Sequence, residues 1–130
     1  MFATFSYDFW PTVIVTLESP IVDDDDYDSF LKEWDDIYTK KMNFNFIFNT
    51  KNVGWVPLKY AFKMSAFIKK IRNYDPQYLK FSIIYVNSDI VNMLLNLIFS
   101  IQKPVAPVYI VNSVNKIGDK LDELSLSSSE

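Results

Sequence analysis

Short apolar runs with the composition of β-strands alternate along this chain with segments whose apolar residues recur at helical spacing. The runs 44–49, 81–86 and 108–111 are almost continuously apolar, a pattern typical of strands that are buried on both faces. The segments between them are long enough to form helices. Parallel strands need such crossover connections, so the alternation predicts an α/β protein.

The complete order of elements predicts a mostly parallel five-stranded sheet with an extra N-terminal strand and four covering helices (β-β-α-β-α-β-α-β-α). At 130 residues the chain has the length of one domain, which we place at 1–124, followed by a flexible serine-rich tail at 125–130. The predicted strands are 2–7, 12–17, 44–49, 81–86 and 108–111, and the predicted helices are 25–40, 57–72, 90–101 and 113–124.

The composition excludes many kinds of enzyme. The chain has no His and no Cys, which removes Ser-His-Asp triads, thiol nucleophiles and imidazole- or thiolate-bound zinc. Its two glycines, Gly54 and Gly118, are isolated and form no phosphate-binding loop. The acidic residues gather mainly around one predicted helix rather than as a pair in a cleft. We therefore predict no catalytic residues, no cofactor and no enzymatic activity.

The acidic segment 23–28 resembles part of a calcium-binding loop. A loop of the EF-hand type that started at Asp24 would need Gly at its sixth position and Glu at its twelfth, where this chain has Ser29 and Asp35. Aspartates also stabilise the N-terminus of a helix, which is the alternative explanation of the segment. We predict no metal site.

No segment has the features of a signal peptide or of a membrane span. The first ten residues lack a basic region and include Asp8, and the longest apolar stretch, 90–101, has 12 residues where a span needs about 20. The net charge of −3 gives no general attraction to nucleic acid. We expect a soluble cytoplasmic protein without an integral membrane segment and without a nucleic-acid partner.

The third predicted helix, residues 90–101, is apolar on almost every side. Its polar residues, Asn92, Asn96 and Ser100, are four apart and form one narrow stripe. A small single-sheet protein has few layers that could cover such a helix, which favours an exposed binding face. The alternative is that the segment around Trp10 or the C-terminal tail covers it. The predicted apolar binding face consists of Ile90, Val91, Leu94, Leu95, Ile98 and Phe99.

The charges are strongly separated along the chain. Residues 51–80 carry seven basic side chains and one acidic one, whereas residues 18–36 carry nine acidic side chains and one basic one. Lys59, Lys63 and Lys70 of the second predicted helix form a candidate basic patch for a lipid headgroup or an acidic partner. Solvated helix faces are the alternative explanation.

Trp55 follows the strand 44–49 in a predicted loop. Loops at the carboxyl ends of parallel strands are where such sheets bind ligands, and tryptophan is enriched at binding hot spots. Trp55 is therefore a candidate loop anchor for a partner. The alternative is that its ring folds back onto the second helix.

The element order and one stretch of sequence resemble known families. Residues 74–79 read Tyr-Asp-Pro-Gln-Tyr-Leu, the next strand ends in Asn87, and the apolar helix that follows is closed by Lys103-Pro104. Over about 12–124 this resembles the fold shared by STAS domains, of the anti-sigma-factor-antagonist type, and CRAL-TRIO lipid-binding domains. The regulated Ser or Thr of STAS domains has no counterpart in 54–58, so the resemblance implies no phosphorylation switch.

These features together predict a non-enzymatic binding module that engages a hydrophobic ligand or lipid through its third helix. The alternative is a STAS-like module for protein–protein interaction or self-association, with a protein partner or a second copy of the chain on the same helix.

Overall fold

The computed structural model describes residues 1–128 and contains a five-stranded sheet in the order β1-β2-β3-β4-β5. β1 and β2 are antiparallel, and β2, β3, β4 and β5 run parallel to one another. This confirms the predicted α/β class and the mostly parallel sheet. The strands are β1 (Ala3–Phe9), β2 (Thr12–Glu18), β3 (Phe44–Asn52), β4 (Leu79–Tyr85) and β5 (Val108–Val111).

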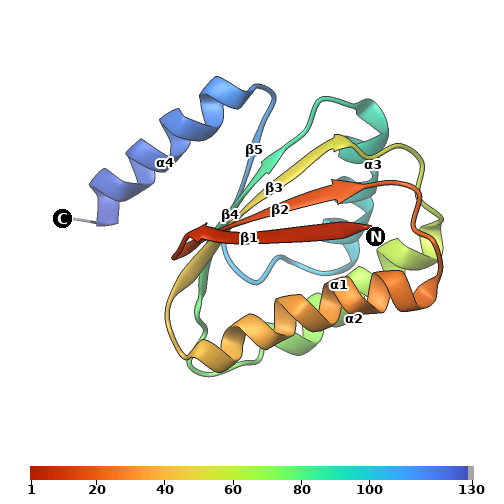
Figure 1. Cartoon of the computed structure of the whole chain (residues 1–130), viewed down its shortest axis with the longest axis horizontal. Helices are drawn as coiled ribbons and strands as arrows, with labels where there is room; N and C mark the ends of the chain where they lie inside the picture. The colour runs from red at the N-terminus through yellow and green to blue at the C-terminus, as the bar shows by residue number, and fades with distance from the viewer. Residues whose placement is uncertain (129–130) are drawn as a thin grey trace.

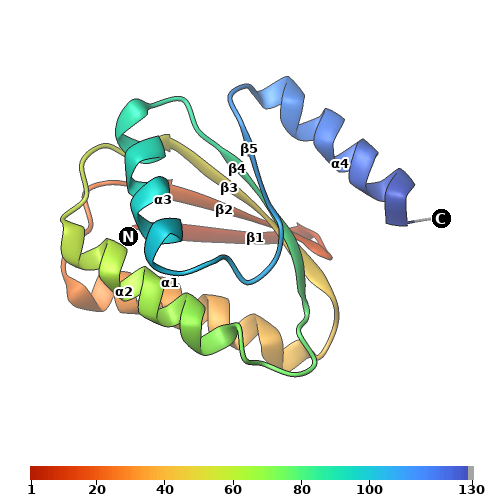
Figure 2. The same ribbon diagram turned by 180° about the vertical axis from the view of Figure 1, so that it is seen from behind.

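Four helices connect and follow the strands: α1 (Asp24–Ile37), α2 (Leu58–Ile71), α3 (Asp89–Ile101) and α4 (Val114–Ser128), with a short 3₁₀ turn η1 (Tyr38–Lys40) after α1. The strands β2 to β5 are added in one direction. Right-handed crossovers then place α1, α2 and α3 on the same face of the sheet. α1 and α2 lie side by side, and α4 lies on the other side of the molecule from them (Figures 1 and 2).

Three helices therefore cover one face of the sheet, and only α4 covers the other face. Side chains of β3 and β4 that point away from α1, α2 and α3, Ile47 and Ile83, form a small second cluster with Val111, against which α4 packs. On β2, Ile14 and Thr16 remain half-buried on that side. The expectation that strands were buried on both faces holds only for the part of the sheet that α4 covers.

α4 also continues further than the sequence predicted. It extends to Ser128, so residues 125–128, which we expected in a flexible tail, belong to the last helix. The remainder of the predicted tail, residues 129 and 130, lies outside the described residues. Polar residues do not interrupt a helix by themselves, and the serine content of this segment was a weak signal for its end.

Two helices begin at a side-chain cap, α1 at Asp23 and α3 at Ser88, and their first residues lie one position before the predicted starts. The side chain of Asp23 accepts a hydrogen bond from the N–H of Asp26 at the start of α1, where three further aspartates occupy the first turn. The hydroxyl of Ser88 accepts a hydrogen bond from the N–H of Val91 at the start of α3.

The main core lies between the sheet and the three helices and is built from aromatic rings. Trp34 of α1 is at its centre and is 6% exposed. Its ring contacts those of Phe30, Phe46, Phe48 and Phe67, with centroid distances of 5.1 to 5.9 Å. The helix α1 is thereby fixed to both β3 and α2.

Asp26 joins α1 to the beginning of the sheet. Its carboxylate accepts hydrogen bonds from the N–H of Phe2 at 2.8 Å and from the N–H of Val22 at 3.0 Å. Partial burial acts to raise the pKa of this carboxyl, but the two backbone N–H groups outweigh it and hold the pKa below its usual value.

We expect Asp26→Asn to lower the free energy of unfolding at pH 7 by about 1 kcal/mol, because an amide offers one acceptor oxygen where the carboxylate offers two. Since the folded pKa is depressed, the wild-type advantage is complete above the unfolded pKa of about 3.9 and is lost as the pH falls through the folded value. Urea unfolding at pH 7 and pH 3 measures this. Asp25→Asn, which changes the same charge on the same helix turn, is the control, and equal losses for both variants would contradict the role of Asp26.

Candidate functional site

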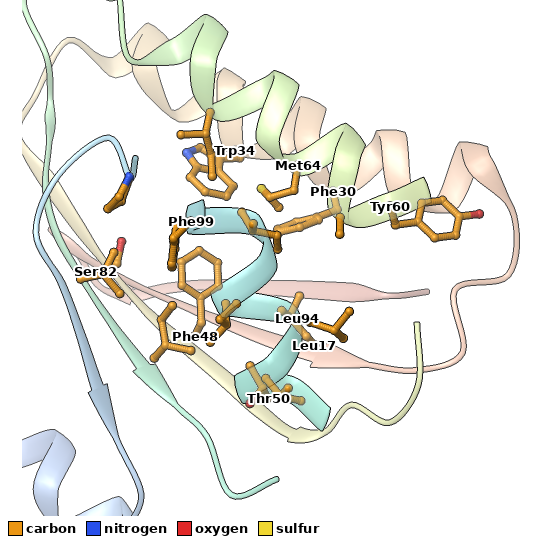
Figure 3. Close-up of a pocket in the computed structure, with 18 of the residues that line it drawn as sticks. Leu17, Phe30, Trp34, Phe48, Thr50, Tyr60, Met64, Ser82, Leu94 and Phe99 are labelled. Atoms are coloured by element: carbon orange, nitrogen blue, oxygen red, sulfur yellow. The ribbon is translucent and has the colours of Figure 1, made fainter. Parts of the chain in front are cut away.

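A cavity of about 140 Å³ lies in the main core, between the sheet and helices α1, α2 and α3. Figure 3 shows side chains from β3, β4, α1, α2 and α3 that surround it. None of the residues that line it is exposed, and those toward α3 and the segment after α3 are half-buried. The lining residues are Phe2, Leu17, Tyr27, Phe30, Trp34, Phe48, Thr50, Val53, Val56, Tyr60, Ala61, Met64, Ile68, Leu79, Ser82, Ile84, Val91, Leu94, Leu95, Ile98, Phe99, Pro104, Val105, Ala106 and Val108.

The lining is apolar and carries no Lys, Arg, Asp or Glu side chain. The hydroxyls of Thr50 and Ser82 are its only aliphatic polar groups. The hydroxyl of Thr50 donates to the carbonyl of Tyr85 at 2.6 Å. Tyr60 contributes its ring, while its hydroxyl points away from the other labelled side chains (Figure 3) and donates to Asp24 at 2.9 Å.

The buried tyrosines are neutral at physiological pH. Burial raises the pKa of Tyr27 well above its ordinary value, and its hydroxyl donates to the carbonyl of Tyr60 at 2.9 Å. Burial also raises the pKa of Tyr60, as does its hydrogen bond to Asp24. No group of the lining therefore supplies a charge with which a polar substrate could be activated.

The structure divides the predicted apolar face of α3. Val91, Leu94, Leu95, Ile98 and Phe99 line the cavity, with Val91 and Leu94 fully buried. These five residues contribute to the cavity wall, and Leu95, Ile98 and Phe99 remain partly accessible to solvent. The sixth predicted residue, Ile90, does not line the cavity and is exposed.

A separate stripe runs along the outer side of α3. Ile90, Met93 and Ile101 are exposed, and Leu97 between them is half-buried. Their spacing of three and four residues places them on one side of the helix. The prediction of the binding face missed Met93, Leu97 and Ile101, although this spacing is visible in the sequence. Neither the segment around Trp10 nor α4 covers α3, because Trp10 stacks on Phe44 and α4 packs on the other face of the sheet.

The candidate basic patch is paired within the chain. Lys59 lies 3.0 Å from Asp24, Lys63 lies 2.9 Å from Asp28, and Lys70 lies 3.4 Å from Asp35. All three pairs join α2 to α1, so the basic and acidic segments of the sequence neutralise each other across one helix interface. Exposed pairs of this kind contribute little to stability, because water and salt screen them. The patch is therefore not presented as free positive charge.

The candidate loop anchor Trp55 does not fold back onto α2. Its side chain is 57% exposed in the loop between β3 and α2. It does not line the cavity, so the structure does not bring Trp55 together with the inner face of α3.

The sheet side of the cavity was not predicted. Phe48 and Thr50 of β3 and Ser82 and Ile84 of β4 point into it. The alternation along a strand places residues of equal parity on one face, so this set could have been grouped from the sequence. Whether a cavity remains between that face of the sheet and the helices depends on how α2 and α3 pack. No simple sequence pattern predicts this packing.

No known family model matches the chain, and no curated protein matches it either. Among residues 1–128, no group of three or more acidic, His or Cys side chains is placed to hold a metal ion. Within the same part of the chain, none of the helices combines the length and the apolar character that crossing a bilayer requires.

Proposed function

We propose that the protein binds a small apolar group in the cavity between its sheet and α3. The observation that carries the proposal is a void of about 140 Å³ whose lining is apolar and uncharged. Native cores are packed to the density of organic crystals, and a void of this size costs stability. A ligand that filled it would recover the lost contacts.

The volume indicates the size of the group. An engineered cavity of about 150 Å³, lined by Leu, Ile and Phe, stays dry and binds benzene. The present cavity fits one ring or a short branched hydrocarbon, either as a whole ligand or as the end of a longer lipid. The same element order that resembles STAS and CRAL-TRIO domains is present in the structure, and we extend the proposal to a relationship with these families.

The outer wall of the cavity suggests how a ligand is admitted. Leu95, Ile98 and Phe99 of α3 are half-buried, as are the lining residues 104–106 after α3. The opposite wall is formed by fully buried strand residues of β3 and β4. We therefore assign the exchange of ligand to a local displacement of α3 and the segment that follows it.

Benzene is the probe that tests the cavity. A ligand that binds only the folded state at ten times its Kd stabilises that state by about 1.4 kcal/mol, which raises Tm by about 5 °C. We expect this rise for the wild-type chain, measured by circular dichroism in sealed cells.

Two variants of α2 make the test specific. Ala61 is buried and lines the cavity, whereas Ala66 is exposed on the same helix. In Ala61→Leu the added side chain occupies the void, and the response to benzene should disappear, while Ala66→Leu should respond like the wild type. No response in the wild type, or equal responses in both variants, would overturn the proposal.

The exposed stripe on α3 favours a second candidate function, self-association through Ile90, Met93 and Ile101. Sedimentation at several protein concentrations tests it. A dimer that dissociates in Met93→Asp would support it, and a wild-type chain that stays monomeric at every concentration would remove it.

A further inference from the structure

Ser82 is the one small polar residue on the part of β4 that faces the cavity. It pairs in register with Phe46 of β3 on one side and Val108 of β5 on the other, and Ile84 follows it on the same face. Its side chain is 6% exposed and contributes to the cavity wall. Figure 3 shows it on β4, beside the segment that leads to β5.

The hydroxyl of Ser82 has no hydrogen-bond partner among residues 1–128. The backbone N–H of Ser82 donates to the carbonyl of Pro107 at 2.9 Å, but no hydrogen bond joins its side-chain oxygen to a described residue. The other buried hydroxyls are paired: that of Thr50 donates to Tyr85, and that of Ser65 donates to the carbonyl of Ala61 at 3.1 Å. Ser82 Oγ is also not one of the fully enclosed unpaired side-chain atoms of these residues, which are Trp34 Nε1 and Asn45 Oδ1, so part of its surface is accessible.

The remaining polar atoms of the lining are not available in the same way. The indole nitrogen of Trp34 is enclosed by protein atoms and is not presented to the cavity. The hydroxyls of Tyr27 and Tyr60 donate to Tyr60 and Asp24. Ser82 is thus the group at which the cavity can form a new hydrogen bond.

We propose that Ser82 recognises a single neutral polar group on the ligand, so that the ligand is a ring or short chain carrying one hydroxyl or carbonyl. The absence of a charged side chain from the lining excludes an ionised group beside it, because a buried charge needs a partner. This inference rests on the proposed function, since it describes the ligand of the same cavity.

Phenol and benzene are matched probes for this inference, because they have the same ring and differ by one hydroxyl. The quantity to compare is the ratio of the Kd for benzene to the Kd for phenol, measured by calorimetry on the full chain. A neutral hydrogen bond contributes about 1 kcal/mol, so we expect this ratio to fall about fivefold in Ser82→Ala. Ser65→Ala, which removes a buried hydroxyl that is already paired, should leave the ratio unchanged.

The outcomes separate the inference from the proposed function. A ratio that is unchanged in Ser82→Ala, while both probes still bind, overturns the role of Ser82 and leaves the cavity as a binding site. If neither probe binds the wild type or Ser82→Ala, both proposals are overturned. Ser82→Ala breaks no hydrogen bond between the described residues, so we expect it to fold about as stably as the wild type, which thermal unfolding verifies.

Discussion

Trp34→Ala is expected to reduce the free energy of unfolding by about 3–5 kcal/mol, because it removes the largest side chain of the core. The ring of Trp34 contacts aromatic rings from α1, β3 and α2 and also lines the cavity, so its removal enlarges an existing void. Domains of this size have a total stability of about 5–15 kcal/mol, so this loss is a large fraction of the total. Urea denaturation followed by far-UV circular dichroism measures the loss.

Trp55→Ala is the matched control for this prediction. It removes the same side chain from a site that is 57% exposed, and we expect a change of about 0.5 kcal/mol or less. If the two variants lost similar amounts of stability, the placement of Trp34 at the centre of the core would be wrong. The pair also separates folding from recognition, because Trp55 is the tryptophan that a partner could contact.

Leu94→Asp is expected to have an effect of similar size, about 3–5 kcal/mol at pH 7. Leu94 is 7% exposed, lies on the inner side of α3 and lines the apolar cavity, where no basic side chain could pair with a new carboxylate. Burial would raise the pKa of that carboxyl. The part of the destabilisation that comes from the charge is absent below the unfolded pKa of about 3.9 and grows as the pH rises toward 7, so part of the lost stability should return near pH 4.

Met93→Asp introduces the same charge one residue earlier on the same helix. Met93 is 48% exposed, so its new carboxylate stays hydrated and the fold should lose about 0.5 kcal/mol or less. Thermal unfolding of both variants between pH 4 and pH 7 measures the difference. A pH-independent loss in Leu94→Asp, or equal losses in the two variants, would contradict the inward orientation of Leu94.

The architecture was largely predictable from local patterns. The apolar run that became β3 and the helix cap at Ser88 each have a direct physical signature in the sequence, and the structure contains both. The boundaries differed by a few residues both inside the chain, where β3 continues to Asn52, and at its end, where α4 continues through residues that have no strong preference. The side of the sheet that each helix covers was less visible, because it follows from the order of the strands and not from any one segment.

The candidate site was predictable only in part. The apolar character of residues 90–101 singled out α3, which lines the cavity, but composition alone could not divide its residues between an inner wall with Leu94 and an outer stripe with Met93. The pairing of Lys59, Lys63 and Lys70 with α1 required the two helices to be adjacent, and that adjacency is a property of the fold. The cavity forms because large rings from distant segments leave the space between them unfilled. No short sequence pattern predicts how such rings pack.

The sheet separates the molecule into two compartments that share strands but not side chains. β3 and β4 send alternate residues to opposite sides, Phe48 and Ile84 toward the cavity, Ile47 and Ile83 toward α4. Changes within the small compartment under α4 reach the large one only through the strand backbones. A tag or fusion attached after α4 would therefore lie across the sheet from the cavity, and it should not contact a ligand bound there.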